Sequence, residues 1–513
     1  MSRFVMSGCP TDSEERIRRH RRTSVGGTET RRRTLIVAAM SVGLVIALGA
    51  CSRSSGGSGS GASGTSTTST GSTGAPFNGQ FGSLTSPVCG PAPSGSTSTP
   101  TSAEVGATSG LNVKGVTASS IRVGTISDTG YVGSPGLNQE LFDAGTVFVD
   151  WCNSLGGING HKIQLDKLDA QVTQYKQVVQ QACTQDFALV GGGAVFDNTA
   201  ETDRLKCLLP NFPGFIVNSE ARGSDLSVQA SIADTNSAVN FGLARYLSTT
   251  FPDSTSSVGY LATDFASVLT LKKQFQEAGA HFGWKTVYDQ AYNAQGEASW
   301  LPFAQTLKTK GVKGLLWEGE PDVLGKLVAA LGQVNYKLDW IAAVSNTADP
   351  KLISAAGDSI KLNNVYVQSN VTPFQATDVP AINQYAQLFD KYLPNGKKTA
   401  QLGLNSFSAW LLFAQAAKAC GANITRLCVY NNGIRTTSWD GGGITAPTNP
   451  STPEVPTSCF VGLKVDGSGI SIIDWQANHG PYNCDPKNVV VLKGSYGKAT
   501  KFTDVGKSLS DLK

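Results

Sequence analysis

Hydrophobic positions from residue 119 onward fall into short β-rich runs that alternate with longer stretches of helical period. The run 121–127 (IRVGTIS) predicts a strand, and the amphipathic stretch 137–155, followed by Gly156 and Gly157, predicts a helix. The same pattern predicts strands over 162–168, 187–190, 214–217, 257–261, 284–288, 314–317, 339–344 and 365–367, and helices over 175–183, 199–208, 238–247, 268–278, 323–331 and 382–392. Alternating strands and helices favour parallel sheets covered by helices on both faces, so the predicted fold class is α/β.

The length of this alternating region indicates two lobes. It takes up about 400 of the 513 residues, whereas single hydrophobic cores stop growing at ~250–300 residues. We therefore predict two doubly wound parallel-sheet lobes. The predicted parts are a signal peptide (1–50), a linker (51–112), the first part of lobe I (113–240), the first part of lobe II (241–368), a return to lobe I with an inserted disulfide loop (369–455), and the C-terminal part of lobe II (456–513).

The N-terminal region has the anatomy of an export signal. Nine arginines stand in residues 1–33 and are followed by an uncharged run of 17 residues, 34–50. As a helix this run spans about 26 Å at ~1.5 Å per residue, which is short for a hydrocarbon core of ~30 Å. A basic flank before a short apolar run is typical of a signal peptide; the alternative is an uncleaved anchor helix. The export route stays open, because residues 30–33 match the twin-arginine motif only loosely.

The residues around Cys51 indicate attachment to a membrane. Leu48-Gly49-Ala50-Cys51 resembles the lipobox of bacterial lipoproteins, which implies that Cys51 receives lipid and becomes the new N-terminus. Of the 23 residues 52–74, 21 are Ser, Gly or Thr, a composition that cannot bury a core and is typical of a flexible tether. We therefore expect the protein to be anchored by lipid on the extracytoplasmic side of the cell membrane.

Charge gives no reason to expect nucleic-acid binding. The chain carries 42 basic and 38 acidic side chains, but 9 and 4 of these stand in residues 1–33, which leaves 33 and 34 in the rest. The body is therefore nearly neutral and lacks the basic surface that attracts phosphate backbones.

Cysteine usage indicates disulfides. Apart from Cys9 in the leader and Cys51, eight cysteines remain, an even number in an exported chain. Many pairings are open to eight cysteines, so spacing alone decides little. Local spacing favours Cys183–Cys207 and Cys420–Cys428, Cys459–Cys484 closes the C-terminal segment, and Cys89–Cys152 follows by elimination. Metal ligation is the alternative, but Cys-x-x-Cys is absent and the histidines are scattered, so no metal site is expected.

One segment carries a family resemblance. Residues 153–163 (NSLGGINGHKI) resemble the signature of type I periplasmic solute-binding proteins, in particular those that bind leucine, isoleucine and valine for ABC importers. Three features match further along: 169–171 (DAQ) after a strand, 191–193 (GGG) at a strand end, and 318–322 (EGEPD) after another strand. The resemblance covers residues 119–413. It implies two lobes joined by three crossings, a ligand in the cleft, and an ABC-type permease as partner.

Side chains that follow the predicted strands are the candidates for ligand binding, because ligands of open α/β sheets bind beyond the carboxyl ends of the strands. The candidates are Asp128, Tyr131, Gly193, Ala194, Val195, Phe196, Ser219, Thr263, Asp264, Phe265, Trp317, Glu318 and Ser345. The aromatic members of this set are predicted to form apolar walls for a small ligand, with ordinary core packing as the alternative.

Two elements carry the expected polar chemistry. Gly191–Gly193 precede a predicted helix, so exposed backbone N–H groups there can hold a carboxylate, as this strand end does in the resembling family; a tight turn is the alternative. Glu318 can pair with a ligand ammonium or be a solvated loop acid. The family's ammonium-binding acid follows the strand that corresponds to 339–344, where this chain has 345–349 (SNTAD) without a glutamate. An amino acid, an amide and other small polar solutes all stay open as ligands.

No catalytic motif supports an enzyme. A G-x-S-x-G elbow does not occur outside low-complexity sequence, H-E-x-x-H is absent, and no histidine has an evident nucleophile partner. We therefore predict a non-enzymatic, lipid-anchored solute-binding protein that needs no cofactor and delivers a small-molecule ligand to an ABC importer. The alternatives are a ligand-sensing surface receptor with the same fold and, less favoured, a lipid-anchored hydrolase.

Overall fold

The structure is a computed structural model that describes residues 78–91 and 110–513, which belong to one compact unit, Thr73–Lys513. The predicted signal peptide, Cys51 and most of the predicted linker lie outside the described residues. Within the described ranges, no helix is both long enough and apolar enough to cross a bilayer.

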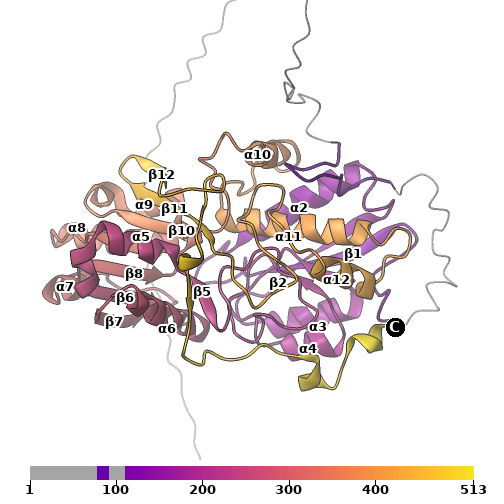
Figure 1. The fold of residues 1–513 in the computed structure, drawn as a ribbon, viewed down its shortest axis with the longest axis horizontal. Coiled ribbons are helices and arrows are strands. Elements are labelled where there is room, and N and C mark those ends of the chain that lie inside the picture. Colours follow the sequence, from indigo (N-terminus) through magenta and orange to yellow (C-terminus); the bar gives the residue numbers. More distant parts are fainter. Residues whose placement is uncertain (1–77, 92–109) are drawn as a thin grey trace, which may run out of the picture. The chain divides into compact units, whose positions relative to one another are not determined.

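The first lobe is built on four parallel strands in the order β2-β1-β3-β4, of which β1 and β2 are labelled in Figure 1. The strands are β1 (Ser120–Ser127), β2 (Lys162–Asp169), β3 (Ala188–Val190) and β4 (Asn211–Phe212). Successive side chains of a strand point to opposite faces, so Ile121 and Val123 join one core and Ile126 joins another. The helices of the first core are α2 (Gln139–Ser154), α10 (Pro380–Tyr392), α11 (Gln401–Lys418) and α12 (Arg426–Ile434), and those of the opposite side are α3 (Tyr175–Gln185) and α4 (Glu201–Lys206).

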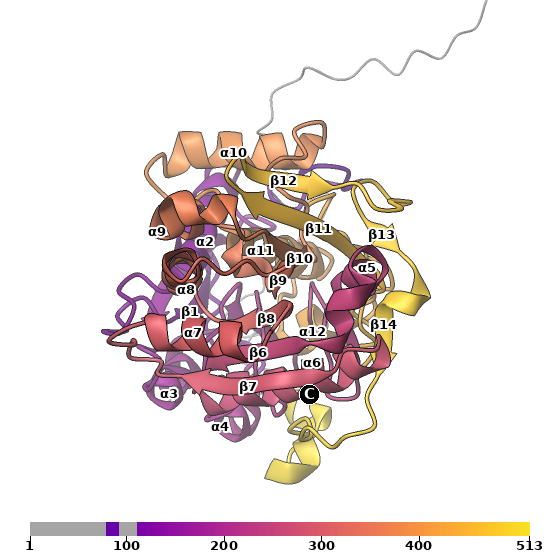
Figure 2. The same ribbon diagram turned by 90° about the vertical axis from the view of Figure 1, so that its left-hand side faces the viewer.

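The second lobe is built on a larger sheet in the order β12-β11-β10-β9-β8-β6-β7, with β13 beside β11 (Figure 2). The strands from β6 to β10 are parallel, and β11 to β13 pair antiparallel. The bounds are β6 (Val258–Thr263), β7 (Thr286–Tyr292), β8 (Gly314–Glu318), β9 (Trp340–Ala343), β10 (Val365–Ser369), β11 (Cys459–Asp466), β12 (Gly469–Ile473) and β13 (Asn483–Cys484). In this lobe too, the apolar side chains of the strands divide between two cores, one on each face.

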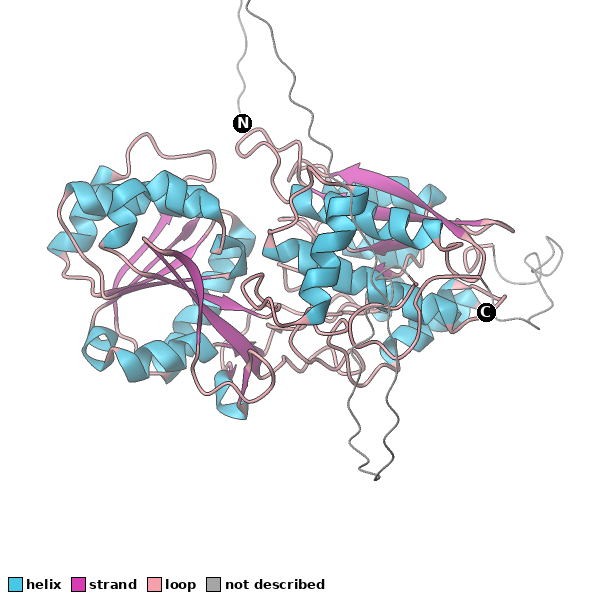
Figure 3. Cartoon of the chain, turned by 90° about the horizontal axis from the view of Figure 1, so that it is seen from above, coloured by secondary structure: helices cyan, strands magenta, loops and turns pink. Residues whose placement is uncertain are grey.

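Helices cover both faces of the second sheet. One core joins the sheet to α7 (Leu301–Thr309), α8 (Pro321–Gln333) and α9 (Pro350–Ala356), and the other joins it to α5 (Gly242–Thr250) and α6 (Ala266–His281). Figure 3 shows this layering, with helices on each side of the strands. The predicted α/β class with two doubly wound lobes is thereby confirmed.

Two predicted elements take a different form. The strand predicted over 214–217 is irregular backbone. The strand of this region is β4, which lies just before it. β4 ends before Pro213 because proline has no N–H to donate to a neighbouring strand. The helix predicted over 238–247 divides into β5 (Ala238–Asn240) and α5, since β5 pairs antiparallel with β14 (Val489–Val491). This pairing partner lies about 250 residues away in the sequence and gives no local signal.

The C-terminal residues return to the first lobe. After β14 the chain forms two 3₁₀ helices, η5 (Phe502–Val505) and η6 (Leu509–Leu512). Leu512 is fully buried against Leu205 of α4 and the nearby Leu226. The prediction assigned all of 456–513 to the second lobe, which the packing of these last residues contradicts. In the described chain there are therefore four passages between the lobes, one more than the three that the resemblance implies.

Part of the predicted flexible linker is folded onto the first lobe. Phe81 is fully buried and packs on Phe407 and Trp151, and Gly82 donates its N–H to Gln384 Oε1 at 2.8 Å. Val88 and Cys89 of this segment are buried in the same core as Phe81. The described chain contains four disulfides, which are the four predicted pairs: Cys89–Cys152, Cys183–Cys207, Cys420–Cys428 and Cys459–Cys484.

Candidate ligand-binding site

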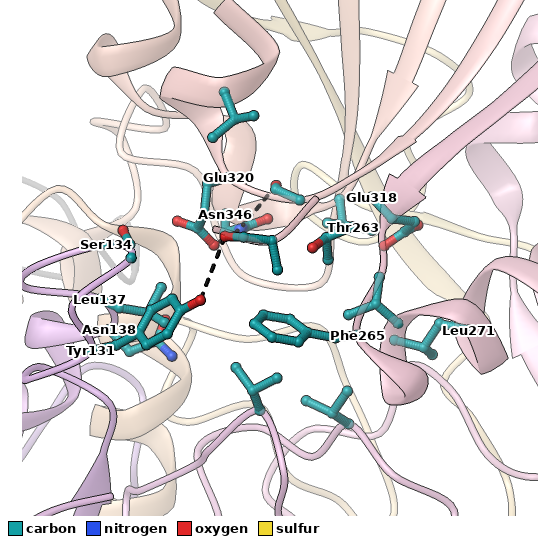
Figure 4. Close-up of a pocket in the computed structure, with 18 of the residues that line it drawn as sticks. Tyr131, Ser134, Leu137, Asn138, Thr263, Phe265, Leu271, Glu318, Glu320 and Asn346 are labelled. Atoms are coloured by element: carbon teal, nitrogen blue, oxygen red, sulfur yellow. Dashed lines mark hydrogen bonds between the residues drawn. The ribbon is translucent and has the colours of Figure 1, made fainter. Parts of the chain in front are cut away.

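A cavity of about 410 Å³ lies where the two lobes face each other (Figure 4). Much of its lining comes from loops at the carboxyl ends of parallel strands in both lobes, the position at which open α/β sheets bind ligands. The first lobe contributes Tyr131, Ser134, Leu137, Asn138, Val195 and residues 215–217, and the second lobe contributes Thr263, Phe265, Val268, Leu271, Phe275, and residues of 292–296, 318–323 and 344–346.

Aromatic and aliphatic side chains form much of the cavity wall. The rings of Phe265 and Tyr131 pack against each other with centres 6.2 Å apart, and Phe196 packs edge-on against Phe265 with ring centres 5.4 Å apart. Phe265 precedes α6, and Tyr131 follows β1, so the two rings come from different lobes. A ligand that contacts this pair of rings contacts both lobes at once.

Hydrogen bonds also cross between the lobes at this site. Gln295 Nε2 donates to the Tyr131 hydroxyl at 2.8 Å, and that hydroxyl lies 3.5 Å from the carbonyl oxygen of Ala294. Asp264 accepts from the N–H of Ala294 at 2.9 Å and so holds the loop after β7 in position. The predicted acid Asp264 therefore supports the cavity wall without lining the cavity.

Glu318, at the end of β8, is the most deeply buried acid of the cavity. Its side chain is 4% exposed, and its Oε1 atom has no hydrogen-bond partner. Burial, the largest cause, and the nearby Asp234 together raise the pKa of Glu318 to about 8, against the opposing effect of the Arg222 guanidinium. In Figure 4 the side chains of Glu318, Thr263 and Glu320 lie along one wall of the cavity, with Phe265 facing them.

Arg222 and Asp234 belong to the segment that leads from the first lobe to the second. Both lie near Glu318. Arg222 is buried and donates from Nη1 to Gln274 Oε1 at 2.8 Å. Burial lowers the pKa of Arg222 and raises that of Asp234 to about 6. The Oδ1 atom of Asp234 is buried and has no hydrogen-bond partner. The three groups form a charged cluster with more carboxylate than cation.

Glu320 forms a second acidic position at the start of α8. Its Oε1 accepts a hydrogen bond from Asn346 Nδ2 at 3.3 Å. Burial, with smaller contributions from Glu140 and Asp322, raises the pKa of Glu320 to about 7, against the opposing effect of Lys351 and Lys397. Its place at a helix N-terminus also favours the ionised carboxylate. The negative charge of an ionised Glu320 is therefore better compensated than that of an ionised Glu318.

The structure brings six of the thirteen predicted site residues together in the cavity lining, and these are Tyr131, Val195, Thr263, Phe265, Glu318 and Ser345. Asp128, Gly193, Ala194, Phe196, Ser219, Asp264 and Trp317 do not line it. Trp317 is fully buried in the second lobe and stacks on Tyr292 at 4.8 Å, because alternate residues of β8 point away from the cleft. Asp128 accepts from the N–H groups of Val172 and Val195, at 2.6 and 2.9 Å, and so fixes the loop that carries Val195.

The hydrogen bonds of the turn at Gly191–Gly193 contradict the expected carboxylate-binding site. The N–H of Gly193 donates to the carbonyl of Ile126 at 3.0 Å, and the N–H of Gly191 donates to the carbonyl of Phe212 at 2.8 Å. The next helix, α4, begins only at Glu201, so no helix N-terminus faces this turn. The glycines instead permit close packing, since a Cβ on Gly193 would lie 2.5 Å from the Phe215 ring. This strand end is a tight turn and not an anion site.

Several lining residues lie outside the strand-end rule. Arg222 and Asp234 belong to residues 213–237, which contain neither helix nor strand, and Leu271 and Phe275 project from the middle of α6. No sequence pattern places such residues at the cavity, because their position depends on how the two lobes meet. Groups of three or more side chains suited to hold a metal ion are absent from the described residues.

Comparisons with known proteins agree with this architecture. The sequence profile of the family described as periplasmic binding protein matches residues 120–469, more than half of the chain. The chain therefore belongs to the periplasmic binding protein family, a family of extracytoplasmic proteins that bind small solutes and do not transform them. The predicted family is thereby confirmed. A search among curated protein sequences gives no match.

Solved structures show the same fold at low sequence identity. A fatty acid ABC transporter substrate-binding protein from Thermomonospora curvata is 15% identical with a TM-score of 0.61, over 74% of this chain and 95% of that one. A branched-chain amino acid ABC transporter protein from Thermus thermophilus with bound valine is 13% identical, with a TM-score of 0.58 over 69% and 95%. A solute-binding protein from R. palustris in complex with 4-hydroxybenzoate is 14% identical, with a TM-score of 0.54 over 69% and 95%.

Proposed function

We propose that this protein is a lipid-anchored solute-binding protein that delivers a small solute to an ABC importer. The observation that carries the proposal is the cavity of about 410 Å³, which has aromatic and acidic side chains from both lobes in its wall. Pockets of ~300–1,000 Å³ bind small molecules in proteins. A ligand that contacts both lobes favours the arrangement in which they enclose it, by its differential affinity for that arrangement.

The similar structures support delivery to a transporter as the role. Those from Thermomonospora curvata and Thermus thermophilus are described as proteins of ABC transporters. Their described ligands, a fatty acid and valine, differ from each other and from 4-hydroxybenzoate. The fold therefore supports solute binding in general, and the identity of the solute depends on the side chains of this cavity.

A panel of solutes tests the binding function. We expect at least one compound among amino acids, amides, amines, aromatic acids and fatty acids to raise the melting temperature of the purified protein. A ligand at a hundredfold excess over its Kd stabilises the fold by about 2.7 kcal/mol. Phe265→Ala removes a cavity wall and should reduce this shift, whereas Phe303→Ala, a half-buried phenylalanine of the same lobe outside the cavity, should not. A folded protein whose melting temperature responds to none of these classes contradicts the proposal.

The lipid anchor is tested separately. We expect Cys51→Ser to prevent lipid attachment, so that the protein leaves the membrane fraction or stays unprocessed. The measurement is membrane fractionation together with the intact mass of the mature chain. A mature wild-type protein that starts well after Cys51 and carries no lipid mass contradicts the anchor and leaves the binding function untouched.

A further inference from the structure

We infer, on the basis of the proposed function, that the solute of this cavity is an organic amine with an apolar body and without a carboxylate, whose ammonium group binds between Glu318 and Asp234. The inference narrows the solute class from small molecules in general to one chemistry. It rests on the charges of the lining, on its unpaired acceptors, on the occupied donors where a carboxylate would bind, and on the apolar wall.

The charged side chains of the lining favour a cation. Four acids line the cavity, Asp234, Glu318, Glu320 and Asp322, against two bases, Arg222 and Lys326. Lys326 already pairs with Asp322 at 3.2 Å. Arg222 is the one base of the lining left for Asp234, Glu318 and Glu320, and the raised pKa values of these three acids mean that they are partly protonated in the empty cavity. A positively charged ligand supplies the missing compensation.

The unpaired atoms at the cluster point to a hydrogen-bond donor. Glu318 Oε1 and Asp234 Oδ1 are both buried without a partner. A buried acceptor without a donor costs free energy, and the cost is larger for a carboxylate than for a neutral group. An ammonium group carries three N–H donors and no acceptor. It can therefore donate to more than one acceptor, whereas an alcohol carries one donor and a carboxylate none.

The site that the sequence predicts for a ligand carboxylate is closed. The N–H groups of Gly191 and Gly193, the expected anion site, donate to main-chain carbonyls. Arg222 Nη1 donates to Gln274 Oε1 at 2.8 Å and lies 3.4 Å from the carbonyl of Thr235. An α-amino acid would thus bring a negative charge into a lining that is already acidic. This distinguishes an amine from an amino acid.

The opposite side of the cavity suits an apolar body. Phe265, Leu271 and Phe275 come from α6 and the residue before it, and Leu137 and Val195 come from the first lobe. An alkyl or phenyl group placed there is removed from water, a transfer worth roughly 25 cal/mol per Å² of apolar surface. The distribution of lining groups, acidic on one wall and apolar on the other, matches a ligand with a charged end and an apolar end.

Proton release accompanies such binding. Without a ligand, the pKa of Glu318 is about 8 and that of Asp234 about 6, with Arg222 as the cation that faces both groups. An ammonium favours the ionised carboxylates and lowers both pKa values. The affinity for an amine therefore rises as the pH increases from 6 to 8.5, a range in which an alkylamine stays protonated.

Isothermal titration calorimetry with four matched compounds tests the inference: 2-phenylethylamine, 2-phenylethanol, 3-phenylpropanoate and phenylalanine. We expect the amine to bind the wild-type protein at least tenfold more tightly than each of the others. Glu318→Gln should reduce the affinity for the amine at least tenfold. The matched control Glu454→Gln, a half-exposed acid outside the cavity, should leave it unchanged. Titration in buffers of different ionisation enthalpy at pH 7 should show proton release.

The outcomes separate this inference from the proposed function. Equal or tighter binding of the alcohol, the acid or phenylalanine overturns the amine inference and keeps the solute-binding function. An amine affinity that Glu318→Gln leaves unchanged, or that falls as the pH rises from 6 to 8.5, overturns it as well. Binding of none of the four compounds also overturns it, and the broader solute panel then decides independently whether the protein binds solutes.

Discussion

Glu318 shows at the scale of one residue how a binding site can reduce the stability of the protein that carries it. The carboxyl group of Glu318 is buried at the end of a strand, near a second acid, Asp234. Its Oε1 atom has no hydrogen-bond partner. Replacing the carboxyl by an amide of the same shape removes a charge that the folded state disfavours. The residue best placed to bind a cation is therefore also one that the empty protein would be more stable without.

This trade-off gives a pH-dependent prediction. In the unfolded chain Glu318 ionises near its ordinary pKa, whereas in the folded protein its pKa is about 8. The protonated carboxyl is thus stabilising at low pH, and this stability is lost as the pH rises through the folded-state value. We expect Glu318→Gln to gain stability relative to the wild type between pH 5 and pH 8, at no more than about 1.4 kcal/mol per pH unit.

Urea unfolding at a series of pH values measures this difference. Glu454→Gln serves as the control, because Glu454 is 53% exposed. A difference between Glu318→Gln and the wild type that stays constant over this pH range would mean that Glu318 is ionised in the folded protein, and it would contradict the described environment of the carboxyl group.

At the scale of the element, the sequence predicts what depends on local pattern. The strands β1, β2 and β6 to β10 stand out as short apolar runs, and the strand-end rule finds Tyr131, Thr263, Phe265 and Glu318. The pattern fails where a distant partner decides the structure, as for β5, whose partner β14 is near the C-terminus. It also misses Arg222 and Asp234, because irregular backbone carries them to the cavity.

The segment 78–91 makes an element-scale prediction about stability. The disulfide Cys89–Cys152 joins this segment to α2 across a sequence separation of 63 residues. Closing a loop of this length is worth about 4 kcal/mol in the chain-entropy account. We expect the double variant Cys89→Ser, Cys152→Ser to unfold at lower urea concentration, with faster proteolysis of the segment.

The pair Cys420–Cys428 provides the control for this experiment, because it closes a loop with a sequence separation of only 8 residues. Its removal should cost less than removal of Cys89–Cys152. Equal midpoints for the wild type and the Cys89, Cys152 variant would show that Phe81 and its neighbours hold the segment without the covalent link.

At the scale of the whole described unit, the chain passes four times between the lobes, and the last passage ends with Leu512 buried against α4. Each lobe keeps its own sheet and its own cores. The cavity wall is completed only where the loops of the two lobes face each other. Binding is thus a property of the pair of lobes, which explains why the sequence predicts individual strand-end residues better than the complete lining.

A crystal structure of the complex tests the central claim most directly. The solute from the panel that raises the melting temperature most is co-crystallised with the wild-type protein. We predict unaltered solute in the cavity between the lobes, in contact with Phe265 from one lobe and Tyr131 from the other, and with its polar end at Glu318. Solute bound elsewhere while this cavity stays empty at saturating concentration would contradict the account.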